Sequence, residues 1–131
     1  MNVITILEVK TEADLLNFIK FPMEVYKSNK NYVPPLINDE KNIWNPKENA
    51  ALDYSEFKRY LAFKDGQIAG RIAVMINHKE INELGIKKVR FGWLDFIDDI
   101  DVSKALIQKA IDYAKEKKIL NLKSHGFYQL R

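Results

Sequence analysis

Alternating hydrophobic and polar residues predict β-strands at several places along the chain. The first strand covers residues 3–9, VITILEV. Two longer runs, 57–64 and 67–77, flank Asp65-Gly66, a dipeptide typical of the tight turn in a β-hairpin. Residues 67–77 place isoleucine, valine and Gly70 on one face, and alanine, methionine and Arg71 on the other. We therefore expect both faces of this strand to be covered, with Gly70 marking a bulge or a close backbone approach.

Three segments have the apolar spacing of amphipathic helices. The first follows Thr11, where TEAD resembles a capping box, and its apolar face includes Leu15, Phe18 and Ile19. A second, short helix is expected to start near Phe21-Pro22, because proline is tolerated in a first helical turn. A longer helix follows the apolar strand 86–97, and its core stripe consists of Val102, Ala105, Leu106, Ala110, Tyr113 and Ala114.

Residues 28–55 form a long connection with a loop-like composition. Pro34-Pro35 and Asn45-Pro46 mark extended backbone and a turn, and a short helix fits between residues 36 and 44. Its aromatic residues indicate that this segment wraps the core. After the long helix, ILNL (119–122) fits one more short strand. This order of elements predicts one α/β (α+β) domain over residues 1–131, with a twisted mixed sheet flanked by helices.

The composition narrows the classes of function. The chain has 21 Lys and Arg against 18 Asp and Glu, a net charge of +3, which gives no strong electrostatic footprint for nucleic acid. The absence of cysteine excludes disulfides and thiolate chemistry. No apolar run reaches membrane-spanning length and no signal peptide is present, so we expect a cytoplasmic protein without a membrane partner. His78 and His125 are too far apart to suggest a ligand pair, and no metal site is predicted.

The turn between the strand 86–97 and its helix holds Asp98, Asp99 and Asp101. Free backbone N–H groups at such strand-to-helix turns bind phosphorylated cofactors in many α/β proteins. Three carboxylates repel a phosphate, and an aspartate that caps the helix occupies the same N–H donors. We therefore predict that the turn caps its own helix. The spacing of its aspartates matches no cation-binding loop.

The order of elements and three phrases of sequence resemble the GNAT (acyl-CoA N-acyltransferase) fold. The phrases are FIKFPMEVYKSNKNYVPPLINDEKNIWNPKENA, AFKDGQIAGRIAVMIN and FGWLDFIDDIDVSKALI, and they resemble the N-terminal portion of a family of bacterial GNAT-like proteins. The resemblance implies a cofactor, acetyl-CoA or another acyl-CoA, and a small-molecule amine as the acceptor. It also implies a cleft beside the strand 89–96, lined by the backbone of Leu94, Asp95 and Phe96, with Asp95 as the candidate base.

The sequence departs from the GNAT pattern in two ways. Active members carry a basic, glycine-rich turn that holds the cofactor's pyrophosphate, whereas this chain has Ile97-Asp98-Asp99-Ile100-Asp101 at that place. The chain also stops before the last elements of the fold, as an N-terminal part of a longer protein would. The alternative to an acyltransferase domain is therefore a degenerate, non-catalytic binding or scaffold module. Such a module is expected to form a homo-oligomer through the sheet edge left open near residue 123.

Two charged side chains on the predicted strands have alternative explanations. Arg71 either binds an anionic substrate or pairs with a carboxylate of the wrapping segment, such as Asp39, Glu40 or Asp53. For Asp95, the alternative to a role as base is a solvent-facing position opposite a buried neighbour.

Overall fold

The computed structural model describes residues 3–124, and in that range five strands form one mixed sheet in the order β1-β2-β3-β4-β5. Neighbouring strands are antiparallel except for the last pair, in which β5 lies parallel to β4. The strands are β1 (Ile4–Glu8), β2 (Ser55–Lys64), β3 (Gln67–Asn77), β4 (Val89–Phe96) and β5 (Leu122–Ser124). The mixed sheet predicted from the sequence is confirmed.

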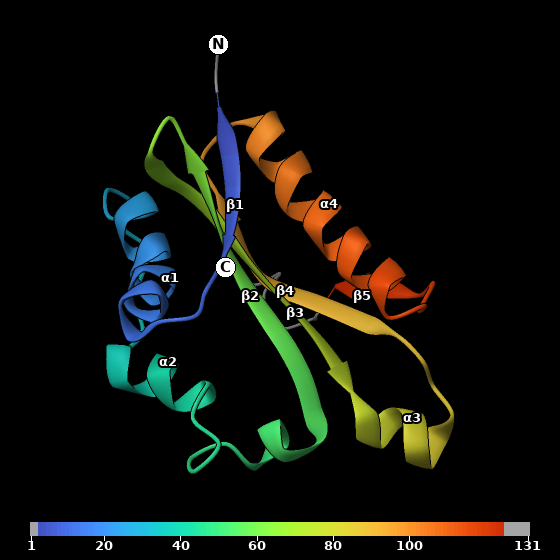
Figure 1. Cartoon of the computed structure of the whole chain (residues 1–131). Coiled ribbons are helices and arrows are strands. Elements are labelled where there is room, and N and C mark those ends of the chain that lie inside the picture. Colours follow the sequence, from blue (N-terminus) through green and yellow to red (C-terminus); the bar gives the residue numbers. More distant parts are fainter. Residues whose placement is uncertain (1–2, 125–131) are drawn as a thin grey trace.

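Helices cover both faces of this sheet (Figure 1). On one side lie α1 (Glu12–Val25) and α2 (Ile37–Ile43), and on the other lies α4 (Ile100–Glu116). The short α3 (His78–Leu84) joins β3 to β4, and a 3-10 helix, η1 (Ala50–Tyr54), precedes β2. Of the described residues, no helix has the length and apolar composition needed to span a membrane.

Each face of the sheet carries its own hydrophobic cluster. The cluster under α4 includes Ile72, Val74, Val89, Leu106 and Tyr113, and these are at most 1% exposed. The cluster under α1 and α2 joins Phe18, Leu61, Ala73 and the two tryptophans, Trp44 and Trp93. Because β3 contributes side chains to both clusters, its two covered faces agree with the expectation from the sequence.

Local sequence signals set several of the element boundaries. Thr11 and Asp14 form the capping box of α1, in which each side chain bonds the other residue's backbone N–H. The Asp65-Gly66 turn has positive φ at both residues, 51° and 83°, as a tight hairpin turn requires. Gly70 lies close to α4, because a Cβ atom there would stand 2.7 Å from Leu106 Cδ1. The glycine therefore marks both a bulge and a close approach.

The structure corrects three expectations. The predicted second helix near residue 21 does not exist, because α1 continues through Pro22 to Val25. Residues 78–84 form a helix that the sequence did not indicate, capped by the Asn77 side chain. The last strand covers Leu122–Ser124 and so begins later than the predicted 119–122. The wrapping segment 28–55 contains α2, as expected, and also η1.

Candidate functional site

A proline inside α1 frees a carbonyl group for another partner. Pro22 has no N–H, so it cannot donate to the carbonyl of Phe18 four residues earlier. Arg71 from β3 donates to that carbonyl instead, with Nη1 2.8 Å from the Phe18 oxygen. The guanidinium also lies over the Phe18 ring, 4.9 Å from its centroid. The helix tolerates the proline because the Arg71 side chain, which comes from the sheet, donates a hydrogen bond to the freed carbonyl.

A β-bulge in β4 turns Asp95 toward Arg71. The register pairs Arg71 with Asp95 and Ala73 with Gly92, so Trp93 and Leu94 together oppose Ile72. Trp93 adopts the positive φ of 49° at this point. Without the extra residue, Asp95 would share the face of Val89 and point toward α4. With it, Asp95 faces α1, on the same side of the sheet as Arg71.

Arg71 and Asp95 form a buried ion pair between neighbouring strands. Both Nε and Nη2 of Arg71 lie 2.9 Å from Asp95 Oδ2. The two residues are 1% and 3% exposed, and the Tyr26 hydroxyl donates to Asp95 Oδ1 at 3.1 Å. The expected partners Asp39, Glu40 and Asp53 are wrong, and so is a solvent-facing Asp95. The bulge causes both errors, since it decides which carboxylate meets the arginine.

This arrangement links three elements of the chain. Arg71 comes from β3, Asp95 from β4, and Tyr26 caps the C-terminal end of α1. Asp95, the candidate base, already accepts hydrogen bonds from two side chains, so it serves to hold the strands and the helix together. Arg71 is also enclosed and makes structural contacts, and its predicted contact with an anionic substrate stays a prediction.

Tyr26, which hydrogen-bonds Asp95, also lines a groove of about 540 Å³. The rings of Tyr26 and Tyr32 lie 5.3 Å apart in its wall, and the side chains of Val33 and Pro35 add apolar surface. Glu40 of α2 lines it too. One carboxylate oxygen of Glu40, Oε2, is buried without a hydrogen-bond partner among residues 3–124. No sequence pattern indicates this groove, because Glu40 reaches the lining residues of 26–35 only when α1 and α2 pack together.

The N-terminus of α4 is occupied by its own capping residue. Asp99 Oδ1 accepts from the backbone N–H groups of Asp101 and Val102, at 2.9 and 3.4 Å. Its other carboxylate oxygen pairs with Lys64 from the end of β2. The hydrogen bond from Lys64 lowers the pKa of Asp99, and the N–H bonds from the helix act in the same direction. The predicted self-capping turn is confirmed.

The residues at this turn do not fit the pyrophosphate of a CoA cofactor. The N–H donors that would hold a phosphate already bond Asp99, and Lys64 is paired with the same side chain. Asp98 and Asp101 add further negative charge. A phosphate here would have to displace the cap and overcome the repulsion of the carboxylates.

The backbone cleft expected at Leu94, Asp95 and Phe96 stays a prediction. Within residues 3–124, β5 pairs with Val89–Phe91, and the residues after Ser124 are outside the described range. Leu94 packs into the cluster under α4, while Phe96 is 36% exposed.

His78 bonds Glu56, and His125 lies outside the described residues. Residues 3–124 hold no cluster of side chains suited to a metal ion.

Two curated proteins are similar to this chain over most of its length. It is 35% identical over 104 residues to protein YghO of Escherichia coli K12, covering 79% of this chain and 26% of that protein. It is 28% identical over 115 residues to the bacterial ceramide synthase of Caulobacter vibrioides, covering 87% of this chain and 30% of that protein. The chain thus spans less than a third of each relative. No model of a protein family matches it.

Solved structures resemble the whole described fold. A tandem GNAT protein from the clavulanic acid biosynthesis pathway matches 93% of this chain and 36% of its own, with a TM-score of 0.69 at 11% identity. Glucosamine-6-phosphate N-acetyltransferase from Arabidopsis thaliana matches 94% and 82%, with a TM-score of 0.61 at 13% identity. A predicted acetyltransferase from Clostridium acetobutylicum, solved with acetyl-CoA, matches 95% and 80%, with a TM-score of 0.58 at 13% identity. The chain therefore has the GNAT fold, and it is related in sequence to YghO and to a bacterial ceramide synthase.

Proposed function

We propose that this chain is one domain of a longer acyl-CoA-dependent N-acyltransferase, and that it contributes the amine-binding side of the reaction. The acetyltransferase fold and the sequence similarity to a ceramide synthase support an N-acyl transfer. Ceramides are N-acylated lipid amines, so the similarity favours an acceptor with an ammonium group and an apolar chain. The relatives are more than three times as long as the matched region, which leaves room for a separate cofactor-binding unit.

The Asp99 cap of α4 is the observation that carries this proposal. In a domain that holds the cofactor at this turn, the N–H groups of the first helical turn must be free to face a phosphate. Here Asp99 satisfies those of Asp101 and Val102, and it also engages Lys64. The pyrophosphate is therefore held elsewhere in the longer protein.

The groove between α1 and α2 has the chemistry of an ammonium site. The Glu40 carboxylate supplies the negative charge, and the faces of Tyr26 and Tyr32 attract a cation. An ammonium group that reaches the buried Oε2 atom of Glu40 would supply its missing hydrogen-bond donor. Val33 and Pro35 would contact the apolar part of the acceptor.

Calorimetric titrations of this chain with coenzyme A and with octylammonium test the two parts separately. We expect no binding of coenzyme A at millimolar concentration, and saturable binding of octylammonium that Glu40→Gln weakens. The matched control is Glu24→Gln, an exposed α1 carboxylate outside this groove. Tight binding of coenzyme A that is lost on lengthening the cap, Asp99→Glu, would overturn the assignment of the cofactor to another unit.

A second candidate function is a non-catalytic scaffold that pairs through a sheet edge. It is favoured by β1, an edge strand of the described sheet, in which Leu7 is 53% exposed and which Val3, 59% exposed, precedes. This candidate predicts a dimer in sedimentation equilibrium and no binding of octylammonium. A monomer that binds octylammonium excludes it in favour of the acyltransferase domain.

A further inference from the structure

Two loops that are distant in sequence meet at one end of the sheet. β4 and β5 are parallel, with Val89 opposite Leu122, and the Val89 N–H donates to the Asn121 carbonyl at 2.9 Å. Parallel neighbours start at the same end, so the loop from α3 to β4 lies beside the loop from α4 to β5. We call residues 83–90 and 115–123 the α3 end. It lies opposite the N-terminus of α4 and the Asp65-Gly66 turn (Figure 1).

Large aliphatic side chains project from both loops of the α3 end. Leu120 is 98% exposed, Leu84 is 67% exposed, and Ile86 is 38% exposed. Leu120 and two other exposed aliphatic side chains lie at the same end of the molecule. Such a group of exposed apolar side chains indicates a surface that contacts a partner.

These side chains are carried on turns with defined hydrogen bonds. Gly85 has a φ of 68°, and the N–H groups of Gly85 and Ile86 donate to the carbonyls of Ile81 and Glu80. The end of α4 is similar, since Lys118 has a φ of 58° and the Ile119 N–H donates to the Ala114 carbonyl. Ile119 is buried at 8% exposure, which fixes the turn and leaves Leu120 pointing outward.

The positive charge of the chain is concentrated at the same end. The α3 end holds seven Lys and Arg residues and two Glu residues, a formal charge of +5, whereas the whole chain has +3. The remaining residues therefore carry −2. Among residues 3–124, Lys87, Lys118 and Lys123 form no ion pair and are exposed. Their ammonium groups are available to an anionic surface.

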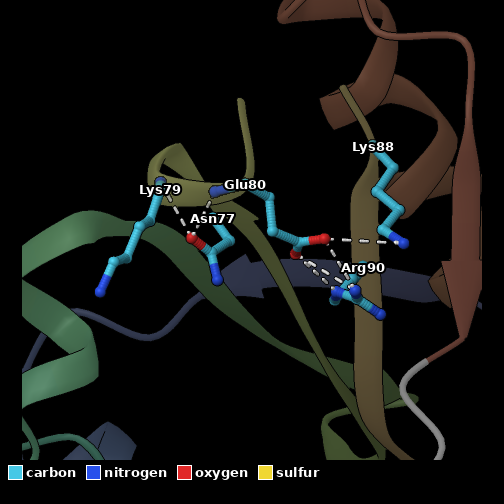
Figure 2. A network of polar contacts seen from close by, with 5 residues as sticks. All are labelled: Asn77, Lys79, Glu80, Lys88 and Arg90. Atoms are coloured by element: carbon cyan, nitrogen blue, oxygen red, sulfur yellow. Dashed lines mark hydrogen bonds and ion pairs between the residues drawn. The ribbon is translucent and has the colours of Figure 1, made fainter. Parts of the chain in front are cut away.

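A network of ion pairs holds α3 against β4 beneath these lysines. Glu80 accepts from Arg90 through both carboxylate oxygens, at 3.1 Å each from Nη2, and pairs with Lys88 at 3.6 Å (Figure 2). Asn77 caps the helix beside it through the N–H groups of Lys79 and Glu80. Because Glu80 neutralises charge inside the network, the outer lysines dominate the potential that a partner meets.

We propose that the α3 end docks on the surface of an anionic lipid bilayer. Leu84, Ile86 and Leu120 enter the interfacial layer, while Lys87, Lys118 and Lys123 contact anionic headgroups. The α3 end contains no aromatic residue on which nucleic acid bases could stack, and its exposed tips are aliphatic, which favours a bilayer over a nucleic acid. This inference is independent of the proposed function.

The inference departs from the expectation of no membrane partner, which rested on the absence of a spanning segment. The fold supplies a different kind of membrane contact, because it brings together two short segments about thirty residues apart that carry no long apolar run.

Flotation of the chain with phosphatidylcholine vesicles, with and without phosphatidylglycerol, tests the inference. We expect binding to the anionic vesicles only, reduced by added salt. Two sets of changes should each weaken binding about tenfold or more. One replaces exposed leucines of the α3 end (Leu84→Ser with Leu120→Ser), and the other removes its exposed lysines (Lys87→Gln, Lys118→Asn and Lys123→Gln). Asparagine is chosen at residue 118 because it tolerates the left-handed backbone there.

Matched controls change the same residue types on other surfaces. Leu36→Ser removes a leucine that is 70% exposed at the start of α2, and Lys10→Gln, Lys30→Gln and Lys47→Gln remove three exposed lysines elsewhere. These controls should bind as the wild type does. Binding unchanged by both α3-end sets, equal binding to phosphatidylcholine alone, or capture by an oligonucleotide with no vesicle binding would each overturn the proposal.

Discussion

The buried ion pair between Arg71 and Asp95 makes a quantitative prediction about stability. Replacing Asp95 with alanine leaves the guanidinium of Arg71, which is 1% exposed, without its carboxylate. The Phe18 carbonyl and ring remain as partners, so part of the interaction survives. Breaking a buried pair on one side costs about 3–5 kcal/mol, because a desolvated charge stays behind. A domain of this length is stabilised by about 7–20 kcal/mol, so the loss is a large part of the total.

The pair of changes Asp95→Ala and Arg71→Met separates the ion pair from the packing around it. The double variant leaves no unpaired charge, and we expect its cost to be smaller than the sum of the two single costs by about 2–3 kcal/mol. The exposed pair of Lys27 and Glu24, with 3.3 Å between Nζ and Oε2, is the control. Its removal should change the free energy of unfolding by less than about 1 kcal/mol, because both side chains are in water.

Urea unfolding followed by tryptophan fluorescence measures these effects. The rings of Trp44 and Trp93 lie 4.8 Å apart between α2 and β4, so their emission reports separation of the helix layer from the sheet. A cost below about 1 kcal/mol for Asp95→Ala would refute the argument, as would strictly additive effects in the double variant.

Three further changes test other parts of the fold. Gly70→Ala should destabilise the domain by about 1–3 kcal/mol in urea unfolding, because the new Cβ would stand 2.7 Å from Leu106 Cδ1 and 3.1 Å from the Asp95 carbonyl oxygen. A cost below about 0.5 kcal/mol would contradict this contact. Hydrogen bonding from Arg90 lowers the pKa of Glu80. The Glu80 carboxylate therefore contributes fully to the stability of the fold above the ordinary pKa of 4.5, and this contribution is lost as the pH falls through the lowered pKa. The difference in Tm between wild type and Glu80→Gln should therefore shrink below pH 4.5, and a constant difference would argue against the pair. Asp99→Ala should lower Tm because two N–H groups of α4 lose their acceptor, whereas the exposed Asp98→Ala should leave it unchanged.

Local signals in the sequence were sufficient for the elements that depend on them. The Asp65-Gly66 turn, the Thr11 capping box and the Asp99 cap each follow from residues within four positions of one another. The apolar stripe of α4 was equally clear, and five of its six predicted residues are buried. Each of these features is decided by short-range geometry, which a sequence pattern describes well.

The candidate site could not be predicted because it depends on an irregularity without a sequence signal. The bulge in β4 occurs at Trp93, a residue that does not indicate a positive φ. A regular strand would have placed Leu94 opposite Arg71 and sent Asp95 toward α4. The groove likewise depends on the packing of α1 against α2, which brings Tyr26 and Glu40 together. The interpretation of Asp95 as a solvent-facing residue failed for the same reason, while its role as a base stays a prediction.

Gly70 and Arg71, which are consecutive, fix the end of β4 from opposite faces of the sheet. Gly70 lets Leu106 of α4 and the end of β4 both approach the backbone of β3 closely, while Arg71 holds the side chain of Asp95 and the freed carbonyl of α1. A shift of β4 would therefore loosen α1 and α4 together. Because Tyr26 hydrogen-bonds Asp95 and also lines the groove, the same shift would deform the proposed ammonium site. Weaker binding of octylammonium by Gly70→Ala, in a sample that remains folded, is the consequence this coupling requires.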